Sequence, residues 1–230
     1  MNNDREKHIA ECIEAFESEK YRFQMFGEQI LSFFRNNKAF VHGMPIPLIH
    51  SLKFRMKDID HLRDKLDRKW NKGEPVTKDN FFQEITDLCG IRVLHLSHEQ
   101  FPFIHNEIMN NVGDEWRLHE PPKAYIWDKE KEAFYKSLGL DVQTKDSNYT
   151  SMHYVIRPNN KNRLVSCEIQ VRTLFEEVWG EIDHSINYPH STDSIACREQ
   201  LKVLAKLVNT GSRLADAILI TFDDYMRQRS

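Results

Sequence analysis

Apolar residues recur every three or four positions near both ends of the chain. The spacing from Ile9 to Phe34 is typical of an amphipathic helix, so we expect an N-terminal helix over residues 4–36 with a break near Gly27. Near the other end, apolar residues between Leu201 and Phe222 follow the same spacing. They predict one long helix or two shorter helices over residues 193–227.

A period of two appears over residues 48–57. Apolar Leu52, Phe54 and Met56 alternate with Lys53, Arg55 and Lys57, which predicts a strand with one apolar and one cationic face. A helix is expected at 58–71, with further helices near 101–113 and 173–186. Other strands are expected at 85–96, 149–157 and 164–172, with a short one at 116–119.

This order of elements predicts the α/β (α+β) class, with a mixed sheet of about five strands flanked by helices. The length of 230 residues fits a single domain, 1–230, whose core occupies residues 45–190. Glycine and proline in residues 43–47 predict a loop between the first helix and the first strand.

Composition narrows the functional classes. The formal net charge of −3 argues against a surface built for nonspecific duplex binding, although a local cationic pocket is compatible with it. No apolar run approaches the roughly 20 residues of a membrane helix, and the polar N-terminus does not resemble a signal peptide. The four cysteines form no CxxC pair, so we expect reduced thiols in a cytoplasmic protein.

Cations cluster in the first predicted strand and the helix that follows it. Like charges side by side on a strand repel, so Lys53, Arg55 and Lys57 require an anion or a covering acid. Lys65 and Arg68 add cations on one face of the helix. That helix alone is better explained by a solvated surface, but strand and helix together favour a cradle for polyphosphate.

Two acids stand out against this cationic background. Asp87 opens the second predicted strand and Glu168 lies on the polar face of the last one. Asp87 could be a simple turn residue, but two carboxylates beside phosphate oxygens are also a typical Mg²⁺ site. Polar residues on single strand faces could equally face water. The chain has no G-x-x-x-x-G-K-[ST] loop, so a nucleotide site must use side-chain cations.

Four short motifs follow one another along residues 45–190. They are Arg55-Met56-Lys57 with Lys65-Leu66-Asp67-Arg68, Asp87-Leu88-Cys89-Gly90-Ile91-Arg92-Val93, Tyr149-Thr150-Ser151-Met152-His153, and Glu168-Ile169-Gln170-Val171-Arg172-Thr173. Each motif is weakly specific by itself. In this order and at this spacing they resemble the RelA/SpoT-type nucleotide pyrophosphokinases, especially the small single-domain alarmone synthetases.

The resemblance implies a nucleotidyltransferase-like synthetase domain and a reaction. The β,γ-pyrophosphate of ATP would move to the ribose 3′-hydroxyl of GDP or GTP, which makes (p)ppGpp, with Mg²⁺ as cofactor. Asp87 and Glu168 would bind the metal and act in catalysis, with Glu168 as candidate general base. The ATP-binding residues would be Arg55, Lys57, Lys65, Arg68 and Arg92. Of these, Arg55 and Arg92 would lie on either side of the adenine. The acceptor would contact Lys53, Tyr149, Ser151, His153 and Gln170.

Departures from the family pattern leave the acceptor open. His61 stands where serine is common, and Thr150 stands where small synthetases often have arginine. Some relatives are toxins that pyrophosphorylate the 3′ end of tRNA, so tRNA is an alternative acceptor, and an inactive nucleotide sensor is a second alternative. Glu181, Asp183 and His184 are better explained by capping or supporting roles than by a second metal site. Residues 193–227 are the candidate segment for a homo-oligomer.

Overall fold

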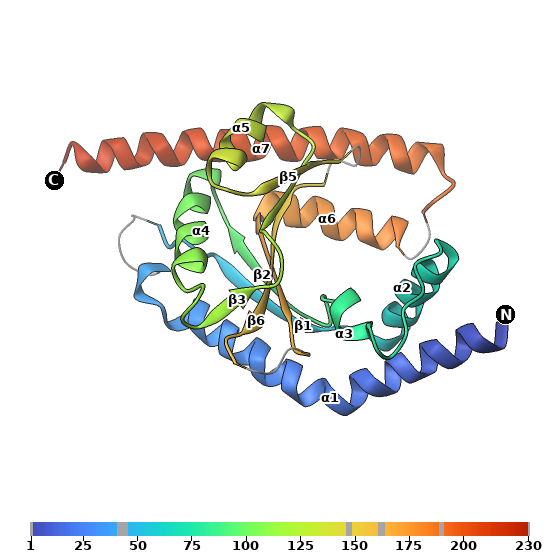
Figure 1. Cartoon of the computed structure of the whole chain (residues 1–230). Coiled ribbons are helices and arrows are strands. Elements are labelled where there is room, and N and C mark those ends of the chain that lie inside the picture. Colours follow the sequence, from blue (N-terminus) through green and yellow to red (C-terminus); the bar gives the residue numbers. More distant parts are fainter. Residues whose placement is uncertain (1, 41–45, 146–148, 161–163, 189–190, 230) are drawn as a thin grey trace.

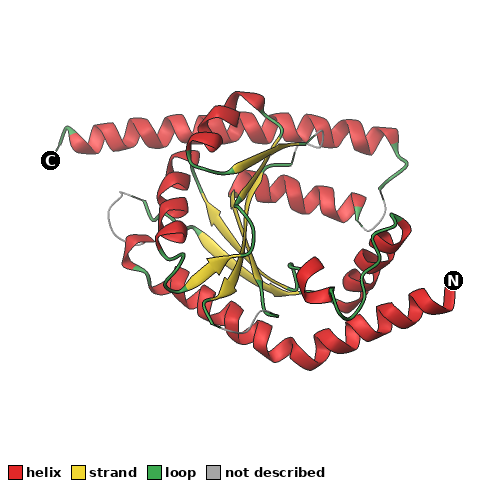
Figure 2. Ribbon diagram, in the orientation of Figure 1, coloured by secondary structure: helices red, strands yellow, loops and turns green. Residues whose placement is uncertain are grey.

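The computed structural model describes residues 2–40, 46–145, 149–160, 164–188 and 191–229. Its strands form one mixed sheet of seven strands in the order β1-β2-β7-β6-β4-β5, with β3 paired to β6 (Figures 1 and 2). The strands are β1 Ser51–Met56, β2 Cys89–His95, β3 Trp116–Leu118, β4 Lys123–Ile126, β5 Asp141–Thr144, β6 Ser151–Pro158 and β7 Cys167–Thr173. The β2–β7 and β4–β5 pairs are parallel, and the other pairs are antiparallel.

Helices flank this sheet, as the sequence predicts. The longest, α1 and α7, lie on opposite sides of the molecule, and α6 lies between the sheet and α7 (Figure 1). The α-helices are α1 Asn2–Asn36, α2 Ile59–Asn71, α3 Phe81–Glu84, α4 Phe101–Asn110, α5 Glu132–Ser137, α6 Leu174–Asn187 and α7 Ile195–Arg227. Short 3-10 turns are η1 Lys38–Phe40, η2 His98–Gln100 and η3 Lys129–Lys131.

The expected number of strands, about five, is wrong because β4 and β5 are not readable from the sequence. Each has only four residues, and three of the four residues of β5 are exposed, so no apolar alternation marks it. The four main strands and the short strand near residue 116 are confirmed, although the second begins later than expected, at Cys89. Gly43, Met44 and Pro45 of the predicted loop lie outside the described residues.

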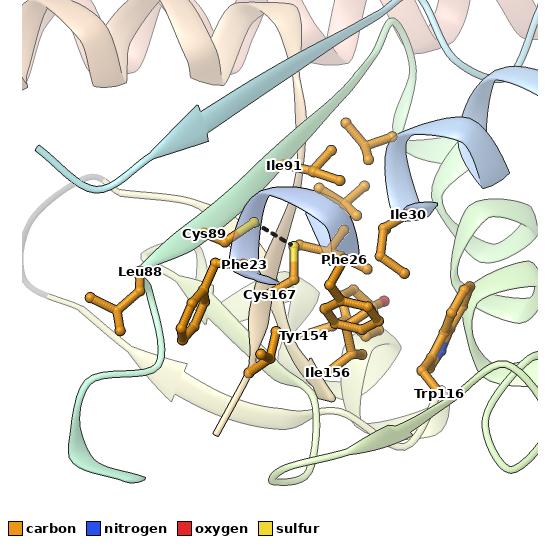
Figure 3. Packing of buried hydrophobic residues seen from close by; sticks show 14 of the residues in the cluster. Phe23, Phe26, Ile30, Leu88, Cys89, Ile91, Trp116, Tyr154, Ile156 and Cys167 are labelled. Carbon is orange, nitrogen blue, oxygen red and sulfur yellow. Dashed lines mark hydrogen bonds between the residues drawn. The ribbon is translucent and has the colours of Figure 1, made fainter. Parts of the chain in front are cut away.

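The expected break of the first helix at Gly27 is also wrong, because α1 runs without interruption. A Cβ atom at this position would lie 2.3 Å from Phe54 Cε2 and 2.5 Å from Cys89 Sγ. The glycine therefore serves close packing of α1 on β1 and β2. Around it, α1 buries Phe23, Phe26 and Ile30 against the apolar face of the sheet (Figure 3).

The predicted helix after β1 is confirmed as α2. Asp58 caps its N-terminus by accepting hydrogen bonds from the backbone amides of Asp60 and His61, at 3.0 and 3.1 Å. Leu62 and Leu66 are buried, which turns the cationic stripe of α2 away from the core and toward the polar face of the sheet.

The last predicted helix is one continuous helix, α7. Only part of its apolar stripe packs inward: Leu201 and Ala205 are buried, whereas Leu207, Leu214 and Ile218 are each more than half exposed. No helix in the described part of the chain is both long and apolar enough to cross a membrane.

A buried ionic group fixes α7 to the end of β2. His98 Nδ1 lies 2.9 Å from Asp216 Oδ2 on α7, and His98 Nε2 lies 3.3 Å from Glu176 Oε1 on α6. Burial alone would lower the pKa of His98, but the hydrogen bonds and charges of the two acids raise it to about 9. His98 is therefore a cation at neutral pH and joins the two helices.

Candidate active site

The register of the sheet brings the four motifs onto one face. Lys53 on β1 lies opposite Arg92 on β2, Arg92 opposite Gln170 on β7, and Gln170 opposite His153 on β6. Lys123 of β4 then lies opposite His153. Directly paired residues share a face, so these five polar side chains form one row across five neighbouring strands.

Asp87 lies just before β2 and joins the cations of β1 and α2. Its Oδ2 accepts a hydrogen bond from Lys57 Nζ at 3.0 Å, and its Oδ1 accepts one from Lys65 Nζ at 2.7 Å. Burial alone would raise the pKa of Asp87, but the two ammonium charges outweigh it and hold this pKa well below its usual value. Asp87 is therefore ionised and bridges two predicted phosphate-binding lysines.

Glu168 on β7 is held by the predicted acceptor residues. Its Oε1 lies 2.9 Å from His153 Nδ1, and its Oε2 accepts a hydrogen bond from Gln170 Nε2 at 2.7 Å. Burial raises the pKa of Glu168, but the charge and hydrogen bond of His153 and the hydrogen bond from Gln170 together outweigh it, so the net shift is downward. The charge of Asp87 also acts on this pKa, which places the two carboxylates within electrostatic reach of each other.

This donor set fits Mg²⁺. The ion usually takes one or two protein carboxylates and completes its octahedral shell with phosphate oxygens and water. Asp87 and Glu168 supply two ionised carboxylates, and no described group of three or more acidic, histidine or cysteine side chains offers a full protein cage. Such a site can hold the metal firmly only together with a phosphate-bearing substrate.

An acid that the sequence analysis missed, Glu177 on α6, stands at the centre of the cationic row. It is 4% exposed, and its Oε1 accepts hydrogen bonds from Lys53 Nζ at 2.6 Å and Arg92 Nη1 at 3.0 Å. Its Oε2 accepts one from Arg172 Nη1 at 3.2 Å. Arg92 also pairs with the exposed Glu181, one turn further along α6. The covering acid that the cationic strand required is therefore supplied by α6.

The predicted acceptor residues form a chain of hydrogen bonds. Arg172 Nη2 donates to the Tyr149 hydroxyl at 2.8 Å, and that hydroxyl lies 3.0 Å from His153 Nε2. With its proton on Nδ1, His153 accepts from Tyr149 and donates to Glu168. The Arg172 guanidinium also lies over the Tyr149 ring, 5.3 Å from its centroid. Ser151 is fully buried next to this chain.

A second aromatic group borders the predicted adenine site. The rings of His184 and Tyr188, at the end of α6, stack at 4.5 Å, and His61 of α2 meets Tyr188 edge-on at 4.9 Å. The Arg68 guanidinium lies over the Tyr188 ring, with its Cζ 5.2 Å from the ring centroid. Burial lowers the pKa of His184, and the charges of His61, Arg55 and Arg92 lower it further.

The structure thus brings most of the predicted site residues together in three groups, around Asp87, around Glu177, and along the chain of hydrogen bonds from Tyr149 to Glu168. Lys57 and Lys65 meet at Asp87. Lys53 and Arg92 both bind Glu177. Lys53, predicted to contact the acceptor, therefore shares a partner with the predicted ATP-binding residue Arg92 and has no direct contact with Tyr149 or His153 among the described hydrogen bonds. Arg55 crosses Gly90, where an added Cβ would lie 3.5 Å from Arg55 Nε. Arg68 contacts the aromatic group of α6 instead of Asp87.

Comparison with known proteins decides the family. The model of the region found in RelA / SpoT proteins matches residues 54–193, which contain every predicted site residue except Lys53. The chain belongs to the RelA/SpoT family. The resemblance read from the four motifs is confirmed.

Individual members of the RelA/SpoT family are distant from this chain. It is 28% identical over 158 residues to the GTP pyrophosphokinase YwaC of Bacillus subtilis (strain 168), and this match covers 66% of the chain and 64% of YwaC. A GTP pyrophosphokinase family protein from Streptococcus pneumoniae superposes with a TM-score of 0.66 at 17% identity, covering 92% of this chain and 94% of that one.

Another similar structure contains a bound nucleotide. The small alarmone synthetase 1 from Bacillus subtilis, solved with its product pppGpp, superposes with a TM-score of 0.63 at 18% identity and covers 93% of this chain and 98% of that one. At such identities the likeness establishes the fold. The mixed sheet with flanking helices is thus the fold of the small alarmone synthetases.

Proposed function

We propose that this RelA/SpoT family member transfers the β,γ-pyrophosphate of ATP to the ribose 3′-hydroxyl of GDP or GTP. The bond between the α- and β-phosphates of ATP breaks and AMP leaves, while the 3′-oxygen bonds to the β-phosphorus and loses its proton. The products are AMP and (p)ppGpp. The observation that carries this proposal is that Asp87 binds the lysines of β1 and α2 while Glu168, held by His153 and Gln170, lies within electrostatic reach of Asp87.

The donor side of the proposal uses cations that already lie together. Phosphoryl transfer depends on positioning and on neutralising charge. Lys57 and Lys65, now bound to Asp87, can turn their ammonium groups to the triphosphate, and Arg68, held against the Tyr188 ring, can donate to it as well. Arg55 and Arg92 would stack on the adenine. Bound Mg²⁺, held by Asp87 and Glu168, would neutralise charge on the transferred phosphates.

The acceptor side uses the chain from Arg172 to Glu168. Tyr149 would stack on the acceptor base, His153 would contact acceptor phosphate, and Gln170 would shape the site between them. Glu168 is our candidate for the group that receives the 3′-hydroxyl proton. Its lowered pKa makes it a weak base, so we expect the proton to move only as the new oxygen–phosphorus bond forms.

A labelling experiment tests the reaction and its acceptor together. Protein is incubated with Mg²⁺ and γ-³²P-ATP in parallel with GDP, GTP, ATP or total tRNA, and products are separated by chromatography. The proposal predicts label on GDP and GTP with release of AMP. Label on tRNA alone would show that tRNA, and not GDP or GTP, is the acceptor. The absence of label from all four acceptors would support the alternative of an inactive nucleotide sensor.

We also propose that the chain forms a homo-oligomer through α7. Val203, Leu207, Leu214 and Ile218 lie in steps of four and seven residues along one face, and each is between 58% and 64% exposed. This spacing is typical of a seam between paired helices, which a second copy of the same helix would complete. Light scattering should show a multimer that Leu214→Glu converts to a monomer; a monomeric wild-type chain would contradict the proposal.

A cytoplasmic location fits the cysteines. Cys12, Cys89 and Cys167 are buried free thiols, and the sulfurs of Cys89 and Cys167 lie 3.7 Å apart without being bonded (Figure 3). We propose a reducing compartment on this ground. Protein trapped with an alkylating reagent at lysis and then unfolded should show four alkylated cysteines; fewer would argue for an oxidising location.

A further inference from the structure

A small cavity lies where α5, α6 and the middle of α7 come together. Its volume is about 20 Å³, and its lining includes Tyr135 of α5, Glu176 of α6 and Ser212 of α7. In Figure 1, α5 lies alongside the middle of α7. Among the described residues that line the cavity, none is a predicted contact of ATP, the acceptor or the metal. The cavity is therefore a feature separate from the candidate active site.

Two buried hydroxyl groups at this cavity have no hydrogen-bond partner within the described part of the chain. Tyr135 is 0% exposed and Ser212 is 2% exposed, and neither the Tyr135 hydroxyl nor Ser212 Oγ is hydrogen-bonded. The two hydroxyl groups therefore do not bond to each other. A buried polar group without a hydrogen bond destabilises the fold, because it has lost its contacts with solvent and gained none in return. A ligand in the cavity that both residues line can supply the lost hydrogen bonds.

The charges around the cavity already balance, so a neutral ligand fits it and an ion does not. Three carboxylates act on the Tyr135 hydroxyl: Glu176, Asp216 and Asp128. His98, a cation at neutral pH, lies 3.3 and 2.9 Å from the first two, and Arg213 Nη2 lies 2.7 Å from the third. The charges of the same acids also act on Lys131, which lines the cavity. Another ion would disturb this balance at a largely buried position.

We propose that the cavity binds one water molecule that bridges the Tyr135 hydroxyl and Ser212 Oγ. A buried water needs roughly 10–15 Å³ of accessible space and about two to four polar partners. The cavity provides about 20 Å³, and Asn209 in its lining offers a third partner. Water donates and accepts, so it can serve both hydroxyl groups whichever way their protons point. The bridge joins α5 to the inner face of α7, whose outer face carries the proposed oligomer seam.

A high-resolution crystal structure tests the proposal directly. Electron density for one water should lie within hydrogen-bond distance of both the Tyr135 hydroxyl and Ser212 Oγ. Crystals soaked in rubidium chloride should give no anomalous signal at this position. The absence of density between the two hydroxyl groups would overturn the proposal. An anomalous peak there would also overturn it, because the ligand would then be a cation.

Urea unfolding provides a second test, in which the sign of the effect decides. With a bridging water, Tyr135→Phe and Ser212→Ala each remove a hydrogen bond and should each lower the urea midpoint. Because one water links both groups, the double variant should lose less than the sum of the two single losses. Without a bridge, Tyr135→Phe removes an unsatisfied buried hydroxyl and should leave the midpoint unchanged or raise it.

Tyr225→Phe is the matched control, because Tyr225 lies on α7 but is 51% exposed, and its midpoint should equal that of the wild type. An unchanged or raised midpoint in Tyr135→Phe, or strictly additive losses in the double variant, would contradict the proposal. Both tests need only the folded chain, so their results do not depend on the proposed reaction.

Discussion

Glu177 and Arg92 form an ion pair, with Oε1 3.0 Å from Nη1, and Lys53 shares the same carboxylate oxygen at 2.6 Å. Because Arg172 binds the other oxygen, one buried carboxylate holds three cations. Glu177→Gln removes the buried counter-charge that these three cations share and leaves Arg92 with only the exposed Glu181. We expect it to lower the free energy of unfolding by about 3 kcal/mol and to raise the KM for ATP, measured by urea unfolding and steady-state kinetics.

Glu181→Gln is the matched control for this prediction. Glu181 also pairs with Arg92, but its side chain is 51% exposed, and within the described residues it forms no other ion pair. Exposed ion pairs contribute less than about 1 kcal/mol. Equal losses of stability in the two variants would mean that Glu177 is not the centre of the cationic row.

Tyr188 is expected to position Arg68 for the triphosphate. The guanidinium lies 5.2 Å from the ring centroid, and such cation–π contacts contribute about 0.5–2 kcal/mol, or roughly 2- to 30-fold in binding. Tyr188→Leu should therefore raise the KM for ATP within this range and leave the KM for the acceptor unchanged. Tyr188→Phe keeps the ring and should restore ATP use. A Phe variant as poor as the Leu variant would contradict this role.

Tyr149 tests the assignment of the acceptor side. Stacking of a base on an aromatic ring contributes about 1–3 kcal/mol, roughly 5- to 150-fold. Tyr149→Ala should weaken acceptor use by a factor in this range and change ATP binding little. Tyr21→Ala on α1, where Tyr21 is 56% exposed, should change neither. Similar losses for both substrates in Tyr149→Ala would show that the two sites are assigned wrongly.

The raised pKa of His98 predicts that the free energy of unfolding falls at alkaline pH. Its pKa is about 9 in the folded chain and about 6.5 unfolded, so the folded state binds the proton more tightly. The stabilisation is complete below pH 6.5, declines as pH rises and is lost above pH 9. Asp216, Glu176, His95 and Lys131 face this imidazole or act on it.

His98→Gln keeps a hydrogen-bonding side chain without the charge. Urea unfolding of both proteins between pH 6 and 10 should show a gap in stability that narrows toward pH 10. Identical pH profiles would mean that the charge of His98 does not bind α7 to the end of β2.

The sequence predicted the cationic side of the site better than its acidic side. Lys53, Arg55 and Lys57 alternate within one strand, so their shared face follows from a local period of two. Glu177 acts on Lys53 and Arg92 across 124 and 85 residues, and on a helix its acid looks like an ordinary solvated charge. The alternating cations of the first strand indicated that an acid or anion must cover them, but they did not indicate which residue supplies it.

Other misses have similar physical causes. Gly27 looked like a helix break because glycine is a poor helix former, but its missing Cβ serves the contact of α1 with Phe54 and Cys89. Tyr188 and Arg68 come together only because α6 ends beside α2, a tertiary arrangement without a local pattern. Short strands such as β5 form because a neighbouring strand pairs with them, and not through their own composition.

The central claim is that Asp87 and Glu168 act together with the neighbouring cations on one ATP–metal complex. It is tested most directly by the rate of AMP and (p)ppGpp formation from ATP and GDP or GTP with Mg²⁺, in the wild type, Asp87→Asn and Glu168→Gln. We predict turnover by the wild type and a loss of at least a hundredfold in each variant, with the fold retained by circular dichroism. Turnover close to wild type in either folded variant would contradict the claim.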